Sequence, residues 1–360
     1  MAKILPQPSA PGWLAEPKKR AAFHALLAAW FARHGRDLPW RRTHDPYAIL
    51  VSELMLQQTQ VATVLPYYAR WLEIFPTVRA LAAAPEAEVL RAWEGLGYYA
   101  RARNLHRAAK AIVEQHGGKF PRTLSEIAAL PGVGRYTAGA VASFAFDLAA
   151  PIVDANVARV LARLLDLALP INTAAGKNAL WSTAEVLLPD AGENGASPRC
   201  FNSALMELGA LLCRARAPQC LLCPVRAFCA AFAAKTQGQR PVKTARRATV
   251  LLQEDCAWIC DRDRVLLQQE TGSRWRGLWK LPPLLPAGVS PPGELPLVQL
   301  TYPFTHHRVT LRVFRAEIPH APLADQHWQP RAALDTLAFA APHRRALRQL
   351  LKQHADAALT

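Results

Sequence analysis

The chain has 360 residues, which is long enough for two domains that each bury a core. Its formal net charge is +16 and its isoelectric point is about 10.0, so we expect a polyanionic partner: nucleic acid first, an anionic membrane surface second. An Ala- and Arg-rich composition without functional meaning is the alternative. No apolar run approaches the ~20 residues that cross a bilayer, and no secretory signal is visible. These properties exclude a membrane-spanning protein and predict a soluble, cytoplasmic one.

The spacing of apolar residues predicts two domains. After an amino-terminal tail, residues 1–19, apolar positions recur every three or four residues from 20 to 234, which predicts a helical domain. Residues 235–247 are polar and basic without periodicity and indicate a linker. Residues 248–360 alternate short apolar runs with turns and close with a helical pattern, which predicts an α+β domain.

Glu53 lies on an apolar stretch that runs from Tyr47 to Gln57. In a helix its neighbours four and three positions before it and three after it are Ile49, Leu50 and Leu56. Such surroundings remove water from the carboxyl group and raise its pKa, which is what a general acid requires. A Glu paired with a neighbouring Arg is the alternative.

Leu130-Pro-Gly-Val-Gly134 separates two helical patterns, residues 123–129 and 135–144. Gly132 and Gly134 are expected to let the backbone adopt left-handed conformations and approach another molecule closely. The N–H groups at the start of the second helix form a natural seat for a phosphate. The pattern predicts a helix-hairpin-helix that holds a DNA backbone without reading its sequence. An ordinary turn between helices is the alternative.

Asp154 follows the apolar Pro151-Ile-Val153 and precedes a helical pattern over residues 155–167, so it is predicted to cap that helix. Backbone N–H groups and the helix dipole there favour the ionised carboxylate. One neutral acid and one carboxylate are the groups that cleave a glycosidic bond. A purely structural helix cap is the alternative.

Four cysteines lie within residues 213–229 with the spacing C-x6-C-x2-C-x5-C: Cys213, Cys220, Cys223 and Cys229. Thiolates this close suit a [4Fe-4S] cluster, with a tetrahedral zinc as the alternative and two disulfides less favoured in a reducing compartment. The remaining cysteines are predicted to be buried, small apolar residues: Cys200, Cys256 and Cys260.

These motifs together resemble the MutY-type adenine DNA glycosylases, a family of the helix-hairpin-helix base-excision superfamily. The resemblance runs from about Leu38 to Cys229 and is weaker in the C-terminal part. Six blocks agree in order: Leu38–Arg41, Ser52–Val61, Gly95–Asn104, Leu130–Gly139, Val153–Val157 and the cysteine motif. The implied fold is a mostly α N-terminal helix-hairpin-helix glycosylase domain with an iron–sulfur loop, plus an α+β Nudix-like C-terminal domain.

The resemblance implies a base-excision repair enzyme with a [4Fe-4S] cluster. Family members flip out adenine mispaired with 8-oxoguanine or guanine in double-stranded DNA and hydrolyse its N-glycosidic bond. We expect a monomer that acts on the nucleoid of a bacterial cytoplasm.

The resemblance also implies roles for single residues. Glu53 would protonate adenine N7, and Asp154 would stabilise the positively charged sugar. Tyr136 and Asn156 would assist, and Arg41 would contact the flipped adenine. Further positions match residues that wedge into the duplex or touch the oxidised guanine: Gln58, Thr59, Leu96 and Tyr98. From sequence alone, Leu96 and Tyr98 would be core residues.

Two positions refine this reading. Tyr136 occupies the place of the Schiff-base lysine of the related bifunctional enzymes, so we expect a monofunctional glycosylase. Ala155 stands where the family usually has glycine, and a left-handed backbone there would cost roughly 1 kcal/mol.

The C-terminal domain is predicted to recognise the lesion. Arg276–Pro282 resembles a Nudix strand motif, but the glutamate-rich box that binds Mg²⁺ is missing, and residues 283–296 offer only Glu294. Phe304-Thr305-His306 matches the family's Phe-Ser-His loop near the oxidised guanine, with an incidental hairpin turn as the alternative.

Three other functions stay open at this point. A pyrimidine-lesion glycosylase/AP lyase of the same fold is the nearest, although Tyr136 disfavours it. An iron–sulfur DNA-binding regulator would have no need of Glu53. A nucleotide hydrolase is the weakest, because the carboxylate box is absent.

Overall fold

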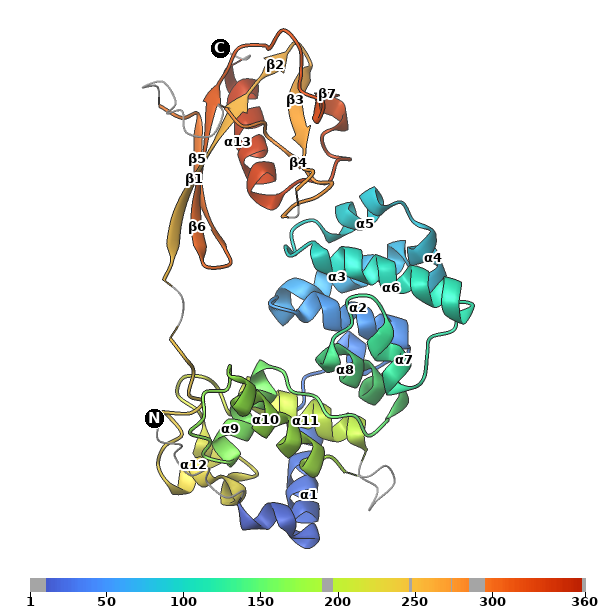
Figure 1. Ribbon diagram of the computed structural model, residues 1–360, viewed down its shortest axis with the longest axis vertical. Helices are drawn as coiled ribbons and strands as arrows, with labels where there is room; N and C mark the ends of the chain where they lie inside the picture. The colour runs from blue at the N-terminus through green and yellow to red at the C-terminus, as the bar shows by residue number, and fades with distance from the viewer. Residues whose placement is uncertain (1–10, 190–196, 246–247, 273, 285–294, 358–360) are drawn as a thin grey trace. The chain divides into compact units, whose positions relative to one another are not determined.

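The computed structural model describes the chain except residues 1–10, 190–196, 246–247, 273, 285–294 and 358–360 (Figure 1). The chain forms two compact units. The first consists of Met1–Ala82 and Arg107–Ala245, and the second of Ala83–His106 and Arg246–Thr360. Part of the predicted tail and most of the predicted loop 283–296 lie outside the described residues. The predicted domain boundaries at 19, 234 and 247 stay predictions.

The first unit is helical, as its periodicity predicts. Two of its helices, α4 and α6, run across the boundaries between the units. Its elements are η1 (Gly12–Ala15), α1 (Pro17–His34), η2 (Pro39–Arg41), α2 (Pro46–Leu56), α3 (Val61–Ile74), α4 (Val78–Ala83), α6 (Ala100–His116), α7 (Leu124–Ala129), α8 (Arg135–Phe146), α9 (Ala155–Leu164), α10 (Ala174–Leu187), α11 (Pro198–Leu211), η4 (Cys220–Leu222), η5 (Arg226–Phe228) and α12 (Ala230–Ala233).

Helix α2 is the most enclosed element of this unit. Asp45 caps it by accepting the Tyr47 N–H at 3.0 Å, and Pro46 occupies its first turn, where no N–H is needed. The residues from Tyr47 to Met55 are all buried. Such a helix is apolar on every side, so its single carboxyl group, that of Glu53, lies in the protein interior.

Helices α7 and α8 form the predicted helix-hairpin-helix. A capping box between Thr123 and Glu126 starts α7, and Gly134 caps α8. Gly132 has a φ of 75°, which favours glycine, but Gly134 has a φ of −86°, and a Cβ built on it would meet nothing within 4 Å. The expectation of a left-handed backbone is therefore wrong for Gly134.

One core cluster of the first unit is formed mainly by α1, α9, α10 and α11. Its buried side chains include Phe23, Leu161, Leu180 and Leu205. Three cysteines of the predicted cluster motif pack against this same core: Cys213, Cys223 and Cys229. The cysteine loop is therefore attached to the body of the helical unit.

The second unit is α+β, as predicted. In one sheet β1 (Val250–Trp258) pairs in parallel with β6 (His307–Arg315), which pairs antiparallel with β5 (Val298–Phe304). The helix α13 packs against β5. In the other sheet β3 pairs antiparallel with β2, β4 and β7. The remaining elements are α5 (Glu86–Trp93), β2 (Cys260–Asp261), β3 (Arg264–Gln269), β4 (Trp279–Lys280), β7 (Gln326–Pro330), η6 (Arg331–Ala333) and α13 (Ala341–Ala357).

No helix among the described residues is long and apolar enough to span a bilayer.

A buried ion pair joins the two chain segments of the second unit. The Arg344 guanidinium donates to the Glu94 carboxylate at 2.7 Å, with only 5% and 9% of the two side chains exposed. The backbone N–H of Phe339 donates to the same carboxylate at 3.1 Å. Arg344 also donates to the carbonyl oxygens of Leu334 and Leu337, so its donors are satisfied on both segments.

Replacing Arg344 by Met should lower the free energy of unfolding of the second unit by about 3 kcal/mol, because it removes the guanidinium group that neutralises the buried Glu94 carboxylate. Denaturant unfolding followed by tryptophan fluorescence measures the change. Arg345→Met is the matched control, since Arg345 is exposed on the same helix. Equal stability of the two variants would contradict the assignment.

Candidate active site

A cavity of about 1080 Å³ in the first unit brings together most of the residues singled out in the sequence. They come from η2, α2 and its following turn, the hairpin, α8 and the start of α9. The predicted residues that line the cavity are Arg41, Glu53, Gln58, Thr59, Gly132, Gly134, Tyr136, Asp154 and Asn156. Helical periodicity alone does not bring these segments together, because they are joined only in the tertiary fold.

Glu53 is an acid that is half protonated near neutral pH. Its side chain is 4% exposed, and burial raises its pKa to about 7, with a further raising effect from the charge of Asp154. The hydrogen bond from Tyr136 and the charge of Arg41 act in the opposite direction. The raised pKa that its apolar neighbours predicted is confirmed.

Tyr136 orients the carboxyl group of Glu53. Its hydroxyl donates to Glu53 Oε2 at 2.7 Å from the first turn of α8. Burial, together with the negative charges of Glu53 and Asp154, raises the pKa of Tyr136 well above its ordinary value. The phenol therefore keeps its proton and serves as a hydrogen-bond donor.

Asp154 caps α9, as predicted, but its electrostatics differ from the prediction. Its Oδ1 accepts the Val157 N–H at 2.6 Å, and its Oδ2 accepts from the Asn156 amide at 3.0 Å. Burial nevertheless raises the pKa of Asp154, and these hydrogen bonds and Arg159 only partly offset it. The prediction that the capping position favours the ionised carboxylate is wrong in direction, because burial outweighs the hydrogen bonds of the cap. Ala155 is not among the residues with positive φ, so it is unstrained.

The predicted DNA-wedging residues are divided between the units. Gln58, with a φ of 58°, and Thr59 form the turn after α2 and line the cavity. Leu96 and Tyr98 belong to the second unit. Leu96 is buried, as expected of a core residue. Tyr98 is 50% exposed and therefore is not a core residue. Its φ of 49° is a backbone conformation that bulky residues rarely adopt.

A second buried carboxylate, Glu207, was missed in the sequence. The Arg36 side chain donates to its two oxygens at 2.7 and 2.9 Å, and Arg41 donates to Oε2 at 2.8 Å. Burial raises the pKa of Glu207, but these two arginines outweigh it and lower the pKa to about 2. Glu207 therefore stays ionised and holds the predicted adenine-contacting Arg41 at the cavity. The positions four and three before it and three after it in α11 are Ser203, Ala204 and Ala210, a weaker apolar pattern than the one that identified Glu53.

Two arginines on α9 connect the cavity to the cysteine loop. Arg159 donates to Asn156 Oδ1 at 2.8 Å, to the Gly209 carbonyl at 2.7 Å and to the Cys213 carbonyl at 2.7 Å. Arg163 donates to Cys213 Sγ at 3.2 Å and to the Arg214 carbonyl at 2.8 Å. The three- and four-residue spacing places Asn156, Arg159 and Arg163 on one face of the helix, a signal that the sequence contained.

The cysteine loop is a set of free thiols that fits a metal cluster. Cys213, Cys220, Cys223 and Cys229 are all partly buried and unbridged. Burial, with the charges of neighbouring thiolates, raises the pKa of Cys223 to about 12 and of Cys229 to about 11. Four such sulfurs become stable thiolates together when iron or zinc neutralises their charge.

Four cysteine thiolates are the ligands of either a tetrahedral zinc ion or a [4Fe-4S] cluster. A tetrahedral zinc holds its sulfurs about 3.8 Å apart, given a Zn–S distance of about 2.3 Å. Within the described residues, the group of three or more candidate ligands with all donor atoms within 4.8 Å is Glu254, Cys256 and His343, and no such set of loop cysteines occurs.

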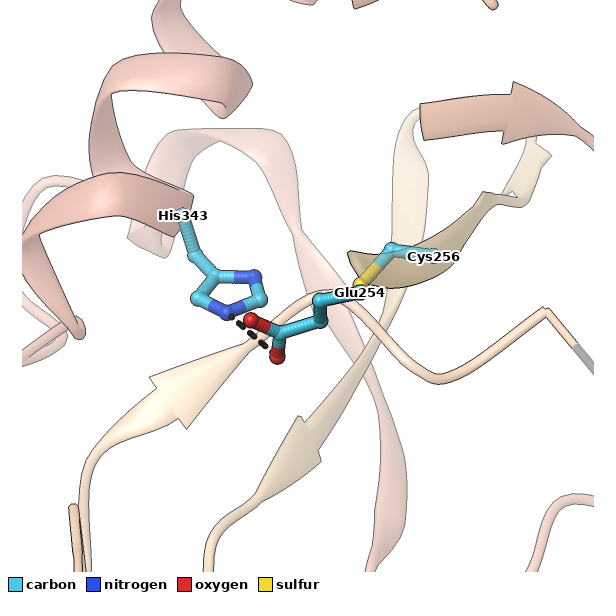
Figure 2. Close-up of side chains that lie close together, drawn as sticks. All are labelled: Glu254, Cys256 and His343. Carbon is cyan, nitrogen blue, oxygen red and sulfur yellow. Dashed lines mark ion pairs between the residues drawn. The ribbon is translucent and has the colours of Figure 1, made fainter. Parts of the chain in front are cut away.

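The group in Figure 2 is close enough to be compatible with metal binding. The Leu281 N–H donates to His343 Nδ1 at 3.3 Å, which puts the imidazole proton on Nε2. This nitrogen faces Glu254 Oε1 at 3.4 Å and so has no lone pair for a metal. The His343 ring therefore faces the Glu254 carboxylate as a donor, and it does not offer a ligand atom to a metal ion. Of the three cysteines predicted to be buried, only Cys256 is; Cys200 and Cys260 are partly exposed.

Phe304, Thr305 and His306 lie at the turn between β5 and β6 in the second unit. Phe304 ends β5, and the Cα register pairs it with His307. Thr305 has a φ of 53° and is exposed. The three residues therefore form a hairpin tip, and their role in recognising the lesion stays a prediction.

Glu53→Gln should remove a pH-dependent loss of stability. The pKa of Glu53 in the folded chain, about 7, exceeds its ordinary value of 4.5. Protonated Glu53 therefore contributes stability that is fully present below about pH 4.5 and is lost as the pH rises through 7. By pH 8 the loss is at most about 3 kcal/mol. Melting temperatures between pH 5 and 8 should therefore fall more steeply for the unchanged chain than for Glu53→Gln. Parallel curves would show that Glu53 has an ordinary pKa.

Comparisons with known proteins agree with this geometry. Residues 51–172 match the family described as "HhH-GPD superfamily base excision DNA repair protein". The chain is 44% identical over 227 residues to the adenine DNA glycosylase of Mus musculus, covering 61% of this chain and 43% of that protein. It is 43% identical over 226 residues to the adenine DNA glycosylase of Mycobacterium tuberculosis, covering 62% of this chain and 71% of that protein.

The fold has a counterpart among solved structures. A thermostable thymine-DNA glycosylase aligns with a TM-score of 0.54 and 32% identity over 61% of this chain and 99% of its own. The chain spans less than half the length of the mouse relative, whereas it covers 71% of the mycobacterial one. From the matched helix-hairpin-helix domain and the extent of this mycobacterial alignment, the chain belongs to the adenine DNA glycosylase family of the HhH-GPD superfamily.

Proposed function

We propose that this chain is a monofunctional glycosylase that removes adenine mispaired with 8-oxoguanine or guanine from double-stranded DNA. The observation that carries the proposal is the cavity in which an acid with a pKa of about 7, Glu53, lies with the carboxyl of Asp154. The reaction adds water to the sugar carbon C1′, breaks its bond to adenine N9, and leaves an abasic site and free adenine.

Glu53 acts as the general acid. The adenine anion is a poor leaving group, and protonation of the ring makes it a better one. The resemblance assigns this protonation to N7. The Glu53 carboxyl still holds its proton in half of the molecules near pH 7, and Tyr136 fixes its orientation through the 2.7 Å hydrogen bond. The buried position keeps water from competing for the proton.

Asp154 stabilises the positive charge that develops on the sugar as the bond breaks. Asn156 and the Val157 N–H hold its two oxygens in place. Arg159 in turn holds the oxygen of the Asn156 amide, so that its nitrogen faces Asp154. A preformed carboxylate position of this kind costs no reorganisation during the reaction.

Arg41 binds the flipped base with a geometry fixed by Glu207. One guanidinium nitrogen contacts Glu207 and the other the Arg36 carbonyl, so the side chain is held at the cavity. Glu207 also lines the cavity, and the exocyclic amino group of adenine would replace one of the four arginine hydrogen bonds that its carboxylate accepts. Adenine carries that donor, whereas thymine and oxidised pyrimidines present other patterns.

The proposed enzyme forms no Schiff base with the sugar. Tyr136 keeps its phenolic proton and has no amine, so the abasic product is left unnicked. Gly132, Gly134 and Arg135 are exposed, and their backbone N–H groups would hold a DNA phosphate, in line with the net charge of +16.

The four loop cysteines would hold a [4Fe-4S] cluster, which would supply four iron–thiolate bonds that fix the fold of the loop. Arg163 donates to the sulfur of Cys213, and Arg159 to its carbonyl, and so they position the loop against the cavity wall. We further propose that the chain works as a monomer in a bacterial cytoplasm, with the Phe304 hairpin reading the oxidised guanine.

Single-turnover assays test the function on duplexes with adenine opposite 8-oxoguanine, guanine or thymine, thymine opposite guanine, and an oxidised pyrimidine. We expect adenine release, fastest opposite 8-oxoguanine and absent opposite thymine, with strand breaks only after alkali. Glu53→Gln should lower the rate at least about a thousandfold while duplex binding persists. Release of thymine or of the oxidised pyrimidine instead, or borohydride trapping of a covalent complex, would refute the proposal.

The pH dependence of the chemical step should report Glu53. Only its protonated form donates, so the single-turnover rate should be level below about pH 7 and fall tenfold per unit above it. Tyr136 lowers the pKa of Glu53 through its hydrogen bond, so Tyr136→Phe should move this descending limb to higher pH. An excision rate independent of pH from 6 to 9 would exclude Glu53 as the acid.

A further inference from the structure

Arg274 of the second unit lies between two aromatic rings. It belongs to the segment that joins β3 to β4, and its guanidinium carbon lies 3.9 Å from the ring centroids of both Trp275 and Phe304. Phe304 is the first residue of the hairpin tip. A cation at this distance from two ring faces is attracted to both, and more strongly where water is partly excluded.

The guanidinium is tethered to the interior of the second unit. Arg274 Nη2 donates to the Tyr302 hydroxyl at 2.8 Å, and that hydroxyl donates to Glu254 Oε2 at 2.7 Å. Burial raises the pKa of Glu254, but its contacts with His343, Tyr302 and Arg274 outweigh it and lower the pKa to about 2. The chain of hydrogen bonds therefore ends on a permanent negative charge.

His343 closes the network from the opposite side. Its Nε2 faces Glu254 Oε1 at 3.4 Å, and its ring meets the Trp275 ring edge-on at 5.4 Å (Figure 2 shows the contact with Glu254). Trp275 is buried and stacks under Arg274. The position of the Arg274 guanidinium is thus fixed by β1, β5 and α13 through their side chains.

The hairpin tip needs such support because its backbone is strained. Thr305 has a φ of 53°, a region that β-branched residues rarely adopt. Strained turns persist where neighbouring contacts hold them, and they occur at positions that contact ligands. Phe304 precedes Thr305 directly, so the stack on Arg274 fixes the approach of the chain to the turn.

We infer that Arg274 is a positioning residue of the hairpin tip, and that it sets the preference for 8-oxoguanine over guanine opposite adenine by holding Phe304 and Thr305 in the reading conformation. The inference rests on the proposed function for its substrate, but the positioning itself does not. Arg274 need not touch the DNA. Its contribution is to keep the tip preformed, so that little conformational freedom is lost on binding.

The test compares Arg274→Met with Arg276→Met in the full chain. Both variants remove one positive charge from the same segment, and Arg276 is exposed. The ratio of single-turnover rates on adenine opposite 8-oxoguanine and opposite guanine should fall about tenfold in Arg274→Met and stay unchanged in Arg276→Met. Tyr302→Phe removes the tether but keeps the ring, and should lower the ratio less. Arg274→Lys keeps the cation and should recover part of the ratio.

A second readout does not need catalysis. Hydrogen exchange of the backbone amides of residues 304–310 should accelerate in Arg274→Met and not in Arg276→Met. Equal exchange and equal rate ratios in the two variants would overturn the inference. If the unchanged chain releases no adenine, the proposed function fails, and the exchange experiment alone then decides whether Arg274 positions the tip.

Discussion

The active cavity depends on one costly arrangement, a carboxyl group in the middle of a helix that is buried on every side. Glu53 sits in α2 among apolar residues, and removal of water is the largest cause of its raised pKa. That position costs stability at neutral pH, because an ionised carboxylate is poorly accommodated there. The hydroxyl of Tyr136 donates to this carboxyl group and orients the acid without forcing it to ionise.

The contrast with Glu207 shows how the same burial gives two outcomes. Glu207 is fully buried in α11, yet Arg36 and Arg41 keep its pKa at about 2. Glu53 has a phenol where Glu207 has two guanidinium groups. One carboxyl group therefore holds its proton near neutral pH and the other does not, although both line one cavity. The charged neighbours of the two carboxyl groups, and not how deeply each group is buried, determine which one keeps its proton.

Much of the site could be predicted from the sequence, because its residues sit in local patterns with direct physical meaning. The apolar neighbours of Glu53, the capping position of Asp154 and the hairpin at Gly132 all follow from spacing along one element. What escaped prediction depends on distant segments. The balance between burial and capping at Asp154 and the grouping of residues 83–106 with the C-terminal part are set by packing between elements. Glu207 also escaped prediction, because Ser203, Ala204 and Ala210 around it form a weaker apolar pattern than the neighbours of Glu53.

The second unit is built from two stretches that are far apart in the chain, and this has a consequence for its synthesis. Arg344 reaches Glu94 across 250 residues, and the Tyr99 hydroxyl reaches the Phe339 carbonyl across 240. The stretch 83–106 leaves the ribosome long before its partners exist, whereas nearly all of the first unit is available by residue 245. Until translation ends, the apolar side chains of α5, including Trp93, have no completed unit to enter. The helical unit can therefore mature early, while this stretch lacks its packing partners, and so is open to chaperones and proteases, until the chain is complete.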